Sequence, residues 1–379
     1  MSLNATQLAL QRKRYPHLSD EEFRFMLQQV DGRERTKEKL PTFANIADWW
    51  YPARLSCEQC SSELTARYKA DLMLQIIHAP FTFTDLTGGY GVDTFFMSEA
   101  AAEAHYVERQ EELCRIVAHN FQKHRPQVQI HNTDSIEYLQ DMPACDVIYI
   151  DPARRDKNGG KVFRLSDCEP NVVDILPTLT AKAKLLIIKL SPMLDITQAL
   201  HSLTGKWDVH IVAVKNEVKE VLLLSHAQAN RLVHAINLPT SKPFSFSRQE
   251  EQEAQCHCFA PIQQALTEPN NYLYEPNAAI IKAGAFKLVA ERYNLCKMAP
   301  NTHLYLANHW VEDFPGRVWQ IVESNVKDTT NISANIMTRN YPLTPEQLRK
   351  KLKIKDSDTH TIIGARLADK PTLFLCKKL

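Results

Sequence analysis

The sequence predicts an α/β protein in which a parallel sheet with crossover helices ends in an antiparallel hairpin. A helical region precedes this sheet and an α+β region follows it. Short β-branched runs alternate with helical stretches between residues 81 and 225, a pattern typical of a parallel sheet. The last two apolar runs, VHIVAV and VLLLSH, are separated only by the polar stretch KNEVKE. Because so short a link cannot hold a crossover helix, these two strands should be antiparallel.

The N-terminal region, residues 1–78, has the pattern of helices. Ser19 and Glu22 have the spacing of a capping box that opens a helix. Between residues 62 and 78, apolar side chains recur at helical spacing, at Leu64, Tyr68, Leu72 and Ile76. We therefore expect a helical region before the first strand.

The sheet is expected within residues 79–226, with helices between consecutive strands. Its five parallel strands are predicted near residues 81–86, 104–108, 127–131, 145–151 and 183–190. The hairpin described above would complete the sheet.

The C-terminal part begins after a polar segment, residues 227–272, which we interpret as an irregular boundary or linker. Two α+β domains should follow, over residues 273–326 and 327–379. The elements expected there are a helix about 277–293, strands near 317–323 and 332–338, a helix capped by Thr344 and Gln347, and a hairpin through TIIGARL and TLFLCKK.

Composition excludes several classes of protein. With 44% hydrophobic and 23% charged residues, the chain is too apolar to be disordered. No apolar run approaches the roughly 18 residues of a membrane span, and the first residues lack the apolar core of a signal peptide. We therefore expect a cytoplasmic protein without a membrane partner. The nine cysteines, including the Cys57 and Cys60 pair, lack a second close pair of ligands, so we expect reduced thiols and no metal.

Charge is unevenly distributed along the chain. The net charge is +1, but residues 80–225 carry 15 Lys and Arg against 20 Asp and Glu, whereas residues 327–379 carry 11 against 5. The middle of the chain is thus acidic and the C-terminal region is basic.

The glycines indicate a ligand site. Only ten are present, and Gly88, Gly89 and Gly91 lie together where the first strand should turn into a helix. Such a loop presents backbone N–H groups at the edge of the sheet where open α/β sheets bind ligands, although tight turns also use glycine.

Two further strand ends suggest the kind of ligand. Glu108 ends the second strand, 20 residues after Gly88, where a carboxylate can accept hydrogen bonds from both ribose hydroxyls of an adenosine. Asp134 and Ser135 follow the third strand and could meet an adenine. The TGGYG spacing lacks the GxGxxG pattern of a dinucleotide site.

Residues 81–225 resemble a class I S-adenosylmethionine-dependent methyltransferase, whose Rossmann-like sheet ends in an antiparallel hairpin. DLTGGYG would be motif I, Glu108 the acidic end of strand two, and Asp151-Pro152-Ala153-Arg154 the fourth-strand motif. The resemblance implies S-adenosylmethionine as the cofactor. The residues that would bind it are Asp85, Thr87, Gly88, Gly89, Gly91, Asp93, Glu108, Arg109, Asp134 and Ser135.

The whole chain is similar to a bacterial family of such enzymes with a ferredoxin-like insert and a THUMP-like C-terminal domain. The stretches that carry this similarity include SSELTARYKA, IDPARR, IKLSPMLD, NEVKE, YEPNAA and TRNYPLTPEQLRKKLKI. For this family the resemblance implies methylation of RNA, either rRNA or tRNA.

Four acceptor chemistries can be compared with the residues near the fourth strand. Uracil C5 and cytosine C5 methylation need a cysteine nucleophile, but KLSPMLD has Ser191 and DPARR has no cysteine. Enzymes that methylate an exocyclic amine use an Asn/Asp-Pro-Pro-aromatic motif. The chain keeps Asp151 and Pro152 of that motif but has Ala153 and Arg154 in place of the rest.

The fourth chemistry is methylation of a ribose 2′-oxygen. Lys69, Asp151, Lys189 and Glu220 resemble the Lys-Asp-Lys-Glu tetrad of ribose 2′-O methyltransferases of the heat-shock rRNA type. We expect all four to point into one cleft, where burial would lower the pKa of a lysine towards that of a usable base. The alternative is that Lys189 and Glu220 form an ordinary ion pair at the sheet edge.

Basic residues mark the candidate RNA contacts. Arg154 and Arg155 would lie near the target nucleotide, and the tail would contribute Arg349, Lys350, Lys351 and Lys353. A lysine run is also typical of a solvated helix face. The other functions left open are methylation of a protein or small molecule, and a non-catalytic RNA-binding protein that holds S-adenosylmethionine. The sequence does not indicate an oligomeric state.

Overall fold

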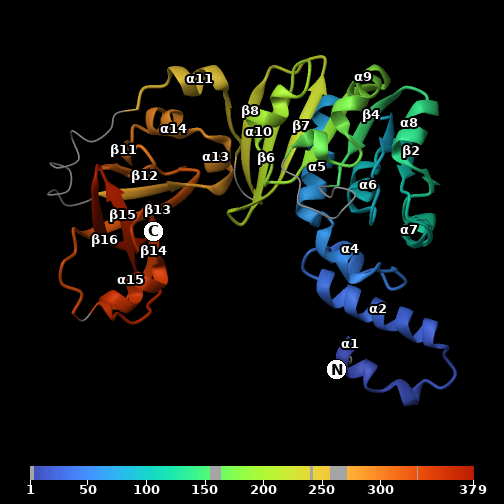
Figure 1. The fold of residues 1–379 in the computed structure, drawn as a ribbon, viewed down its shortest axis with the longest axis horizontal. Helices are drawn as coiled ribbons and strands as arrows, with labels where there is room; N and C mark the ends of the chain where they lie inside the picture. Colours follow the sequence, from blue (N-terminus) through green and yellow to red (C-terminus); the bar gives the residue numbers. More distant parts are fainter. Residues whose placement is uncertain (1–3, 154–163, 240–241, 257–270, 331) are drawn as a thin grey trace. The chain divides into compact units, whose positions relative to one another are not determined.

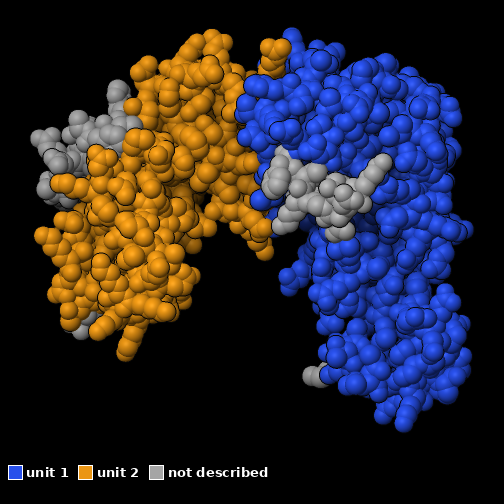
Figure 2. All heavy atoms as spheres, in the orientation of Figure 1, with its two compact units in different colours: residues 1–210, 219–230 blue, residues 211–218, 231–379 orange. Residues whose placement is uncertain are grey.

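A computed structural model describes residues 4–153, 164–239, 242–256, 271–330 and 332–379. It divides into two compact units (Figure 2), which consist of residues 1–210 with 219–230, and of residues 211–218 with 231–379. The five parallel strands lie in the first unit, and the α+β region lies in the second.

The N-terminal region is helical, as predicted. Ser19 and Ser62 begin its two longest helices, where each side chain accepts a hydrogen bond from the backbone N–H three residues later. The α-helices in residues 4–78 are α1 (Ala5–Ala9), α2 (Asp20–Thr36), α3 (Pro41–Ala44), α4 (Arg54–Gln59) and α5 (Glu63–Ile76).

The parallel strands of the first unit belong to a nine-stranded sheet in the order β3-β2-β1-β4-β5-β7-β6-β8-β9, in which the first five strands are parallel and β7 is antiparallel to β5. Figure 1 labels β2, β4, β6 and β7 among these strands. In β4 and β5, residues 147–150 and 185–188 are fully buried, which explains why central strands appear as continuous apolar runs. The strands are β1 (Phe81–Asp85), β2 (Ala101–Val107), β3 (Val128–His131), β4 (Cys145–Ile150), β5 (Ala183–Leu190), β6 (Asp208–Val214) and β7 (Glu217–His226).

The predicted antiparallel hairpin is confirmed, with a shorter link than KNEVKE. Lys215 and Asn216 alone join β6 to β7, and both have positive φ, 51° and 66°. Two such residues form the type of turn that suits the twist of paired strands. The last four residues of KNEVKE belong to β7.

Helices connect the parallel strands, with α7 packed against β3 and α9 packed against β4 and β5. These crossover connections place the carboxyl ends of the parallel strands at one edge of the sheet. The connecting helices are α6 (Val92–Met97), α7 (Glu111–His124), α8 (Ser135–Asp141) and α9 (Val172–Lys182), and α10 (Ile196–His201) follows β5.

The segment expected to be irregular, residues 227–272, is more regular than predicted. It contains β8 (Leu232–Leu238), β9 (Phe244–Ser247) and α11 (Arg248–Glu253), and β8 pairs antiparallel with β9. These short strands are flanked by polar residues, so composition alone conceals them.

The second unit holds a sheet in the order β11-β12-β10-β13-β16-β15-β14. Its neighbours are antiparallel except β14 and β15, which are parallel and connected through α15. The strands are β10 (Tyr272–Pro276), β11 (Cys296–Ala299), β12 (Thr302–Ala307), β13 (Gly316–Ser324), β14 (Asn335–Arg339), β15 (His360–Leu367) and β16 (Lys370–Lys378).

The prediction of a single helix about 277–293 is wrong. Gly284 has a φ of 77°, a left-handed conformation that ends a helix. Two helices result, α13 (Ala278–Ala283) and α14 (Phe286–Arg292). The helix predicted from Thr344 is α15 (Pro345–Leu352), with both hydrogen bonds of its capping box.

Within the described ranges, no helix combines the length and the apolar run that a membrane crossing needs.

Candidate active site

Acidic residues end or directly follow several parallel strands of the first unit. Asp85 ends β1, Glu108 follows β2, and Asp151 follows β4. Asp134 lies three residues beyond β3, where its side chain caps α8 by accepting a hydrogen bond from Ile136 N. The sheet therefore brings together carboxylates that are far apart in the sequence.

The glycine loop joins β1 to α6 in a conformation that needs its glycines. Gly89 and Gly91 have positive φ, 53° and 77°. At Gly88, a Cβ atom would lie 2.1 Å from the ring of Tyr106. The Tyr106 hydroxyl in turn donates to the Gly89 carbonyl at 2.5 Å. Larger residues would displace the loop from the end of β2.

Asp85 lies beneath this loop and supports it. Its carboxylate accepts hydrogen bonds from the backbone N–H of Thr87 at 2.9 Å and from the Thr94 hydroxyl at 2.5 Å. Burial raises the pKa of Asp85 to about 7, despite these hydrogen bonds. The Thr87 hydroxyl accepts from the backbone N–H of Asp151 at 2.6 Å, which links the ends of β1 and β4.

Glu108 is positioned beside the glycine loop. Its two carboxylate oxygens accept hydrogen bonds from the backbone N–H groups of Gly89 and Gln110, at 3.0 and 2.9 Å. Arg109 points elsewhere, since it forms an ion pair with Glu169 at 2.8 Å. Ser135 is the first residue of α8 and is partly buried.

The four tetrad residues belong to one ion network. Lys69 Nζ, on α5, lies 2.7 and 2.8 Å from the two carboxylate oxygens of Glu220, on β7. Lys189 Nζ, at the end of β5, lies 2.5 Å from Asp151 Oδ2. Asp93 on α6 connects the two pairs, at 3.2 Å from Lys69 and 3.5 Å from Lys189.

Two hydroxyl groups complete this network and were not predicted. Ser61, between α4 and α5, donates to Asp93 Oδ2 at 2.7 Å and accepts from Lys69 and Lys189 at 3.4 and 3.2 Å. The Tyr149 hydroxyl also donates to Asp93, at 2.7 Å. No local pattern marks Ser61, because its contacts are all with residues of other segments.

The expectation that all four tetrad residues point into one cleft is wrong. The side chain of Lys69 is 0% exposed and that of Glu220 is 4% exposed, whereas Asp151 is 37% exposed. Lys189 lies between these extremes. Only the Asp151 end of the network is open to an acceptor, and Lys69 and Glu220 lie behind it.

The expected lowering of the lysine pKa is also wrong for Lys189. Burial alone would lower its pKa, but the charges of Asp151, Asp93 and Glu220 outweigh burial and raise it above the usual range. Lys189 is therefore held as an ammonium ion. Burial opposes the charge of Asp93, but Lys69 and Lys189 hold the pKa of Asp93 well below its usual range.

Pro152 and Ala153 continue from Asp151. Pro152 is buried, and Ala153 exchanges two backbone hydrogen bonds with Glu169, at 2.8 and 3.0 Å. Arg154 and Arg155 lie outside the described residues.

The candidate RNA contacts of the tail differ in their surroundings. Lys350, Lys351 and Lys353 are exposed, whereas Arg349 forms an ion pair with Asp356. Leu348 anchors α15 in the core of the second unit.

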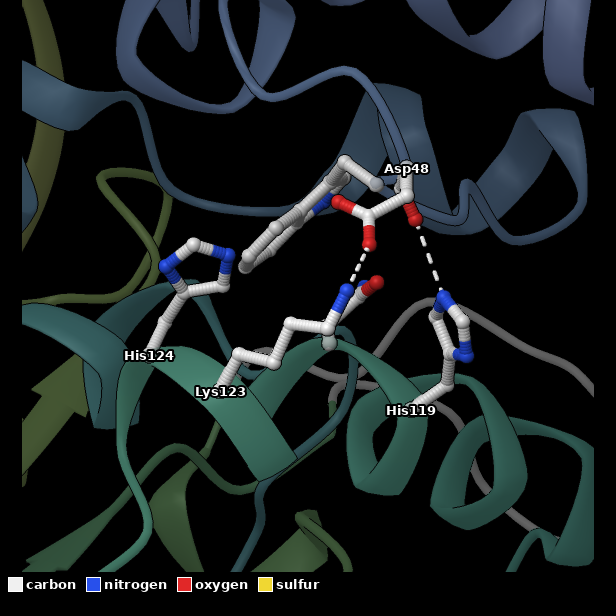
Figure 3. A pocket seen from close by; sticks show the side chains of 6 residues that line it. Asp48, His119, Lys123 and His124 are labelled. Carbon is white, nitrogen blue, oxygen red and sulfur yellow. Dashed lines mark hydrogen bonds and ion pairs between the residues drawn. The ribbon is translucent and has the colours of Figure 1, made fainter.

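A shallow polar pocket lies between the N-terminal region and α7 (Figure 3). The Asp48 carboxylate contacts Lys123 Nζ at 2.5 Å, and His119 Nε2 lies 2.9 Å from the Asp48 carbonyl oxygen. Nearby, the Trp49 indole donates to the Tyr90 hydroxyl of the glycine loop at 2.8 Å. These groups satisfy one another and fasten the N-terminal region to the sheet domain.

Metal-binding groups of three or more His, Cys, Asp or Glu side chains do not occur within the part of the chain that the structure describes.

This parallel sheet with its terminal hairpin and glycine loop defines a methyltransferase fold of class I. Over 100% of both chains, the protein is 31% identical to a putative methyltransferase from Porphyromonas gingivalis W83, with a TM-score of 0.85. Residues 272–315 match a ferredoxin-like domain family and residues 317–378 a THUMP domain-like family. The chain belongs to the family of S-adenosylmethionine-dependent methyltransferases that carry these two C-terminal domains.

More distant relatives agree with this assignment. Uncharacterized S-adenosylmethionine-dependent methyltransferases from two Mycobacterium tuberculosis strains, CDC 1551 / Oshkosh and H37Rv, are each 20% identical over 270 residues. Each match covers 65% of this chain and 71% of the relative. The cofactor is therefore S-adenosylmethionine.

The residues at the strand ends fit this cofactor. Glu108 is partly exposed, and its carboxylate can accept more than the two backbone hydrogen bonds it already has. At Gly89, a Cβ atom would meet nothing closer than the Thr87 carbonyl at 3.9 Å, so the loop is open on that side. Glu108 would hold the ribose hydroxyls, and Gly89 would let the cofactor approach the backbone.

Proposed function

We propose that the enzyme methylates RNA, either rRNA or tRNA, and that the acceptor atom is a ribose 2′-oxygen. The match of residues 317–378 to a THUMP domain-like family and the basic charge of residues 327–379 support the choice of RNA. The choice of ribose depends on one observation. Lys69, Asp151, Lys189 and Glu220 form a single ion network through Asp93.

Asp151 is the residue we assign to contact with the acceptor. A ribose hydroxyl must lose its proton during methyl transfer, and accurate placement contributes most of the rate enhancement. S-Adenosylmethionine, when bound, supplies a methyl group on a positively charged sulfur. Lys189 holds Asp151 Oδ2, so Asp151 Oδ1 accepts the hydrogen bond of the hydroxyl and takes its proton as the new oxygen–carbon bond forms.

The buried residues position this pair and set its charge. Two lysines face three carboxylates, Asp93, Asp151 and Glu220, so the network has a net charge of about −1 when all are ionised. A negative excess favours a cationic donor nearby. Lys69 and Glu220 are positioning residues, because both are too buried to touch an acceptor.

Mass spectrometry of nucleosides tests this function. Total rRNA and tRNA from a strain without the gene should lack one 2′-O-methylated nucleoside that the parent strain contains. Expression of the wild-type enzyme should restore it, and expression of the Lys189→Ala variant should not.

Other results would point to other acceptors. Loss of a base-methylated nucleoside would keep RNA as the substrate but favour an exocyclic amine held by Asp151 and the Pro152 carbonyl. An unchanged nucleoside profile would reject RNA and favour a protein or small-molecule acceptor.

A further inference from the structure

Two sequence stretches outside the active site meet in the second unit. Glu275 belongs to YEPNAA on β10, and Arg339 belongs to TRNYP at the end of β14. Arg339 Nε lies 2.5 Å from Glu275 Oε1. Arg317 on β13 is the cross-strand neighbour of Glu275, with its Nη1 3.7 Å from Glu275 Oε2. We call these three residues the Glu275 cluster.

The Glu275 cluster combines a buried anion with two open cations. The Glu275 side chain is 4% exposed, whereas those of Arg317 and Arg339 are 45% and 43% exposed. Glu275 Oε2 is buried and receives no hydrogen bond from any described residue. Because one carboxylate faces two guanidinium groups, a net charge of about +1 remains at the surface.

Both arginines keep hydrogen-bond donors that the cluster does not use. Arg339 uses Nε for Glu275 and Nη1 for the Thr338 carbonyl. Arg317 has only the loose 3.7 Å contact with Glu275 as an ion pair among the described residues. A guanidinium group carries five N–H donors in a planar fork, which matches two oxygens of a phosphate.

The backbone around the Glu275 cluster is closely packed. At Gly316, a Cβ atom would lie 2.0 Å from the Glu275 carbonyl oxygen, so β13 can approach β10 only with glycine before Arg317. On the other side, Asn340 donates to the Thr302 hydroxyl at 3.1 Å. The backbone beside both arginines is thus fixed before any ligand arrives, which reduces the entropy lost on binding.

A purely structural role explains the contact of Arg339 with Glu275 but not the position of Arg317. β13, β16 and β15 separate β10 from β14 in the sheet order, so the short contact of Arg339 with Glu275 ties an edge strand back to β10. Arg317 adds little to that link, because its contact is long and half exposed. Its position beside a second guanidinium group needs another reason.

We propose that Arg317 and Arg339 bind a phosphate of the RNA backbone, with Glu275 holding the two guanidinium groups side by side. This inference rests on the proposed function and extends it by naming a contact between substrate and second unit. Backbone phosphates are present in every RNA, so this site contributes affinity and position without reading the sequence.

Binding of labelled RNA to the full-length protein tests the proposal. Fluorescence anisotropy would follow fluorescein-labelled bulk bacterial tRNA and, as a second probe, fragmented rRNA at several salt concentrations. The informative variant is Arg317→Gln, and the matched control is Arg366→Gln, which removes the same charge from β15 of the same sheet. Thermal unfolding of each variant would show that it is folded.

The expected result separates the two variants. Arg317→Gln should weaken RNA binding about tenfold at 0.1 M salt. It should also reduce the slope of log K against log salt concentration by about 1. Arg366→Gln should change affinity less than twofold, and Arg317→Lys should recover part of the loss.

Equal losses in the folded Arg317→Gln and Arg366→Gln variants, or no loss in either, would overturn the phosphate site. RNA methylation would stand in that case, because the wild-type protein would still bind RNA. If the wild-type protein bound neither RNA probe, the proposed function itself would fail together with this inference.

Discussion

Each unit buries a carboxylate between two basic side chains, but the two units enclose it to different degrees. In the first unit Asp93 lies between Lys69 and Lys189, whose side chains are 0% and 13% exposed. In the second unit Glu275 lies between Arg339 and Arg317, which are both nearly half exposed. The buried charges around Asp93 can therefore interact mainly with one another and with a bound substrate. The half-exposed arginines of the Glu275 cluster can also interact with groups in the solvent.

The energetic consequences differ in the same way. Breaking a buried ion pair by removing one partner costs about 3–5 kcal/mol, because the remaining charge stays buried, whereas exposed pairs contribute about 0–1 kcal/mol. The network around Asp93 should thus be intolerant of single substitutions. The Glu275 cluster should tolerate the loss of Arg317 far better, because Arg339 keeps its short contact with the buried carboxylate.

The largest expected effect is on turnover, when the partly exposed pair of Lys189 and Asp151 is broken. Lys189→Ala should lower kcat by about 10²- to 10⁴-fold, because Asp151 loses the cation that orients it. Calorimetry should find the affinity for S-adenosylmethionine little changed. Glu108→Ala should give the opposite pattern, with weaker cofactor binding as the main effect. Unchanged turnover of the true substrate by Lys189→Ala would remove this residue from the reaction.

The next effect compares the stability of the two clusters. Lys69→Met should lower the free energy of unfolding by about 3–5 kcal/mol, since Asp93 and Glu220 remain buried without their shared cation. Arg317→Met should cost about 1 kcal/mol, because its contact with Glu275 is long and half exposed and Arg339 keeps its short contact with the carboxylate. Urea unfolding measures both. Similar losses for the two variants would contradict the comparison.

The third effect is on the pH dependence of the free energy of unfolding, through the buried carboxylate of Asp85. Because the pKa of Asp85 is raised to about 7, the folded protein keeps a proton that the unfolded chain releases near pH 4. Stability from this group is complete below pH 4 and is lost as the pH rises through 7, by about 2–4 kcal/mol. Asp85→Asn should remove that part of the pH dependence. An identical dependence in the variant would mean that other groups cause it.

The smallest effect tests Ser61, which bridges both lysines of the network. Ser61→Ala should lower kcat about three- to tenfold and shift the pH profile of kcat, because Lys69, Lys189 and Asp93 lose a shared hydroxyl. Ser62→Ala is the control, since the Ser62 hydroxyl caps α5 through the backbone N–H and the hydroxyl of Thr65, and its loss should affect stability rather than the pH profile. A pH profile that does not move would give Ser61 a structural role alone.

The sheet of the first unit could be predicted because its strands have strong local signals. Buried β-branched runs such as that ending at Lys189 differ clearly from the helices beside them, and a short link leaves only an antiparallel hairpin. The strands β8 to β12 were missed because they are short and partly polar. β10, for example, ends in Pro276 after a tyrosine-rich stretch.

The sequence indicated the four tetrad residues of the candidate site, but not Ser61, Tyr149 or the arrangement of these groups. Lys69, Asp151, Lys189 and Glu220 could be grouped because their residue types and positions resemble the Lys-Asp-Lys-Glu tetrad. This resemblance could not show that Asp93 connects them, since that contact depends on how α5 packs against α6. The direction of the Lys189 pKa shift could not be predicted either, because it depends on whether burial or the charges of the neighbouring carboxylates dominate, and the charges do.

The position of Glu220 also has a consequence during synthesis on the ribosome. Ser61 is the first residue of the network in the chain and Glu220 is the last. The nascent chain therefore cannot complete the network until β7 has emerged and paired with β5. A polypeptide interrupted before that point would retain the glycine loop yet leave Lys69 without its nearest anion. Methyl transfer should therefore begin only after the whole first unit has folded.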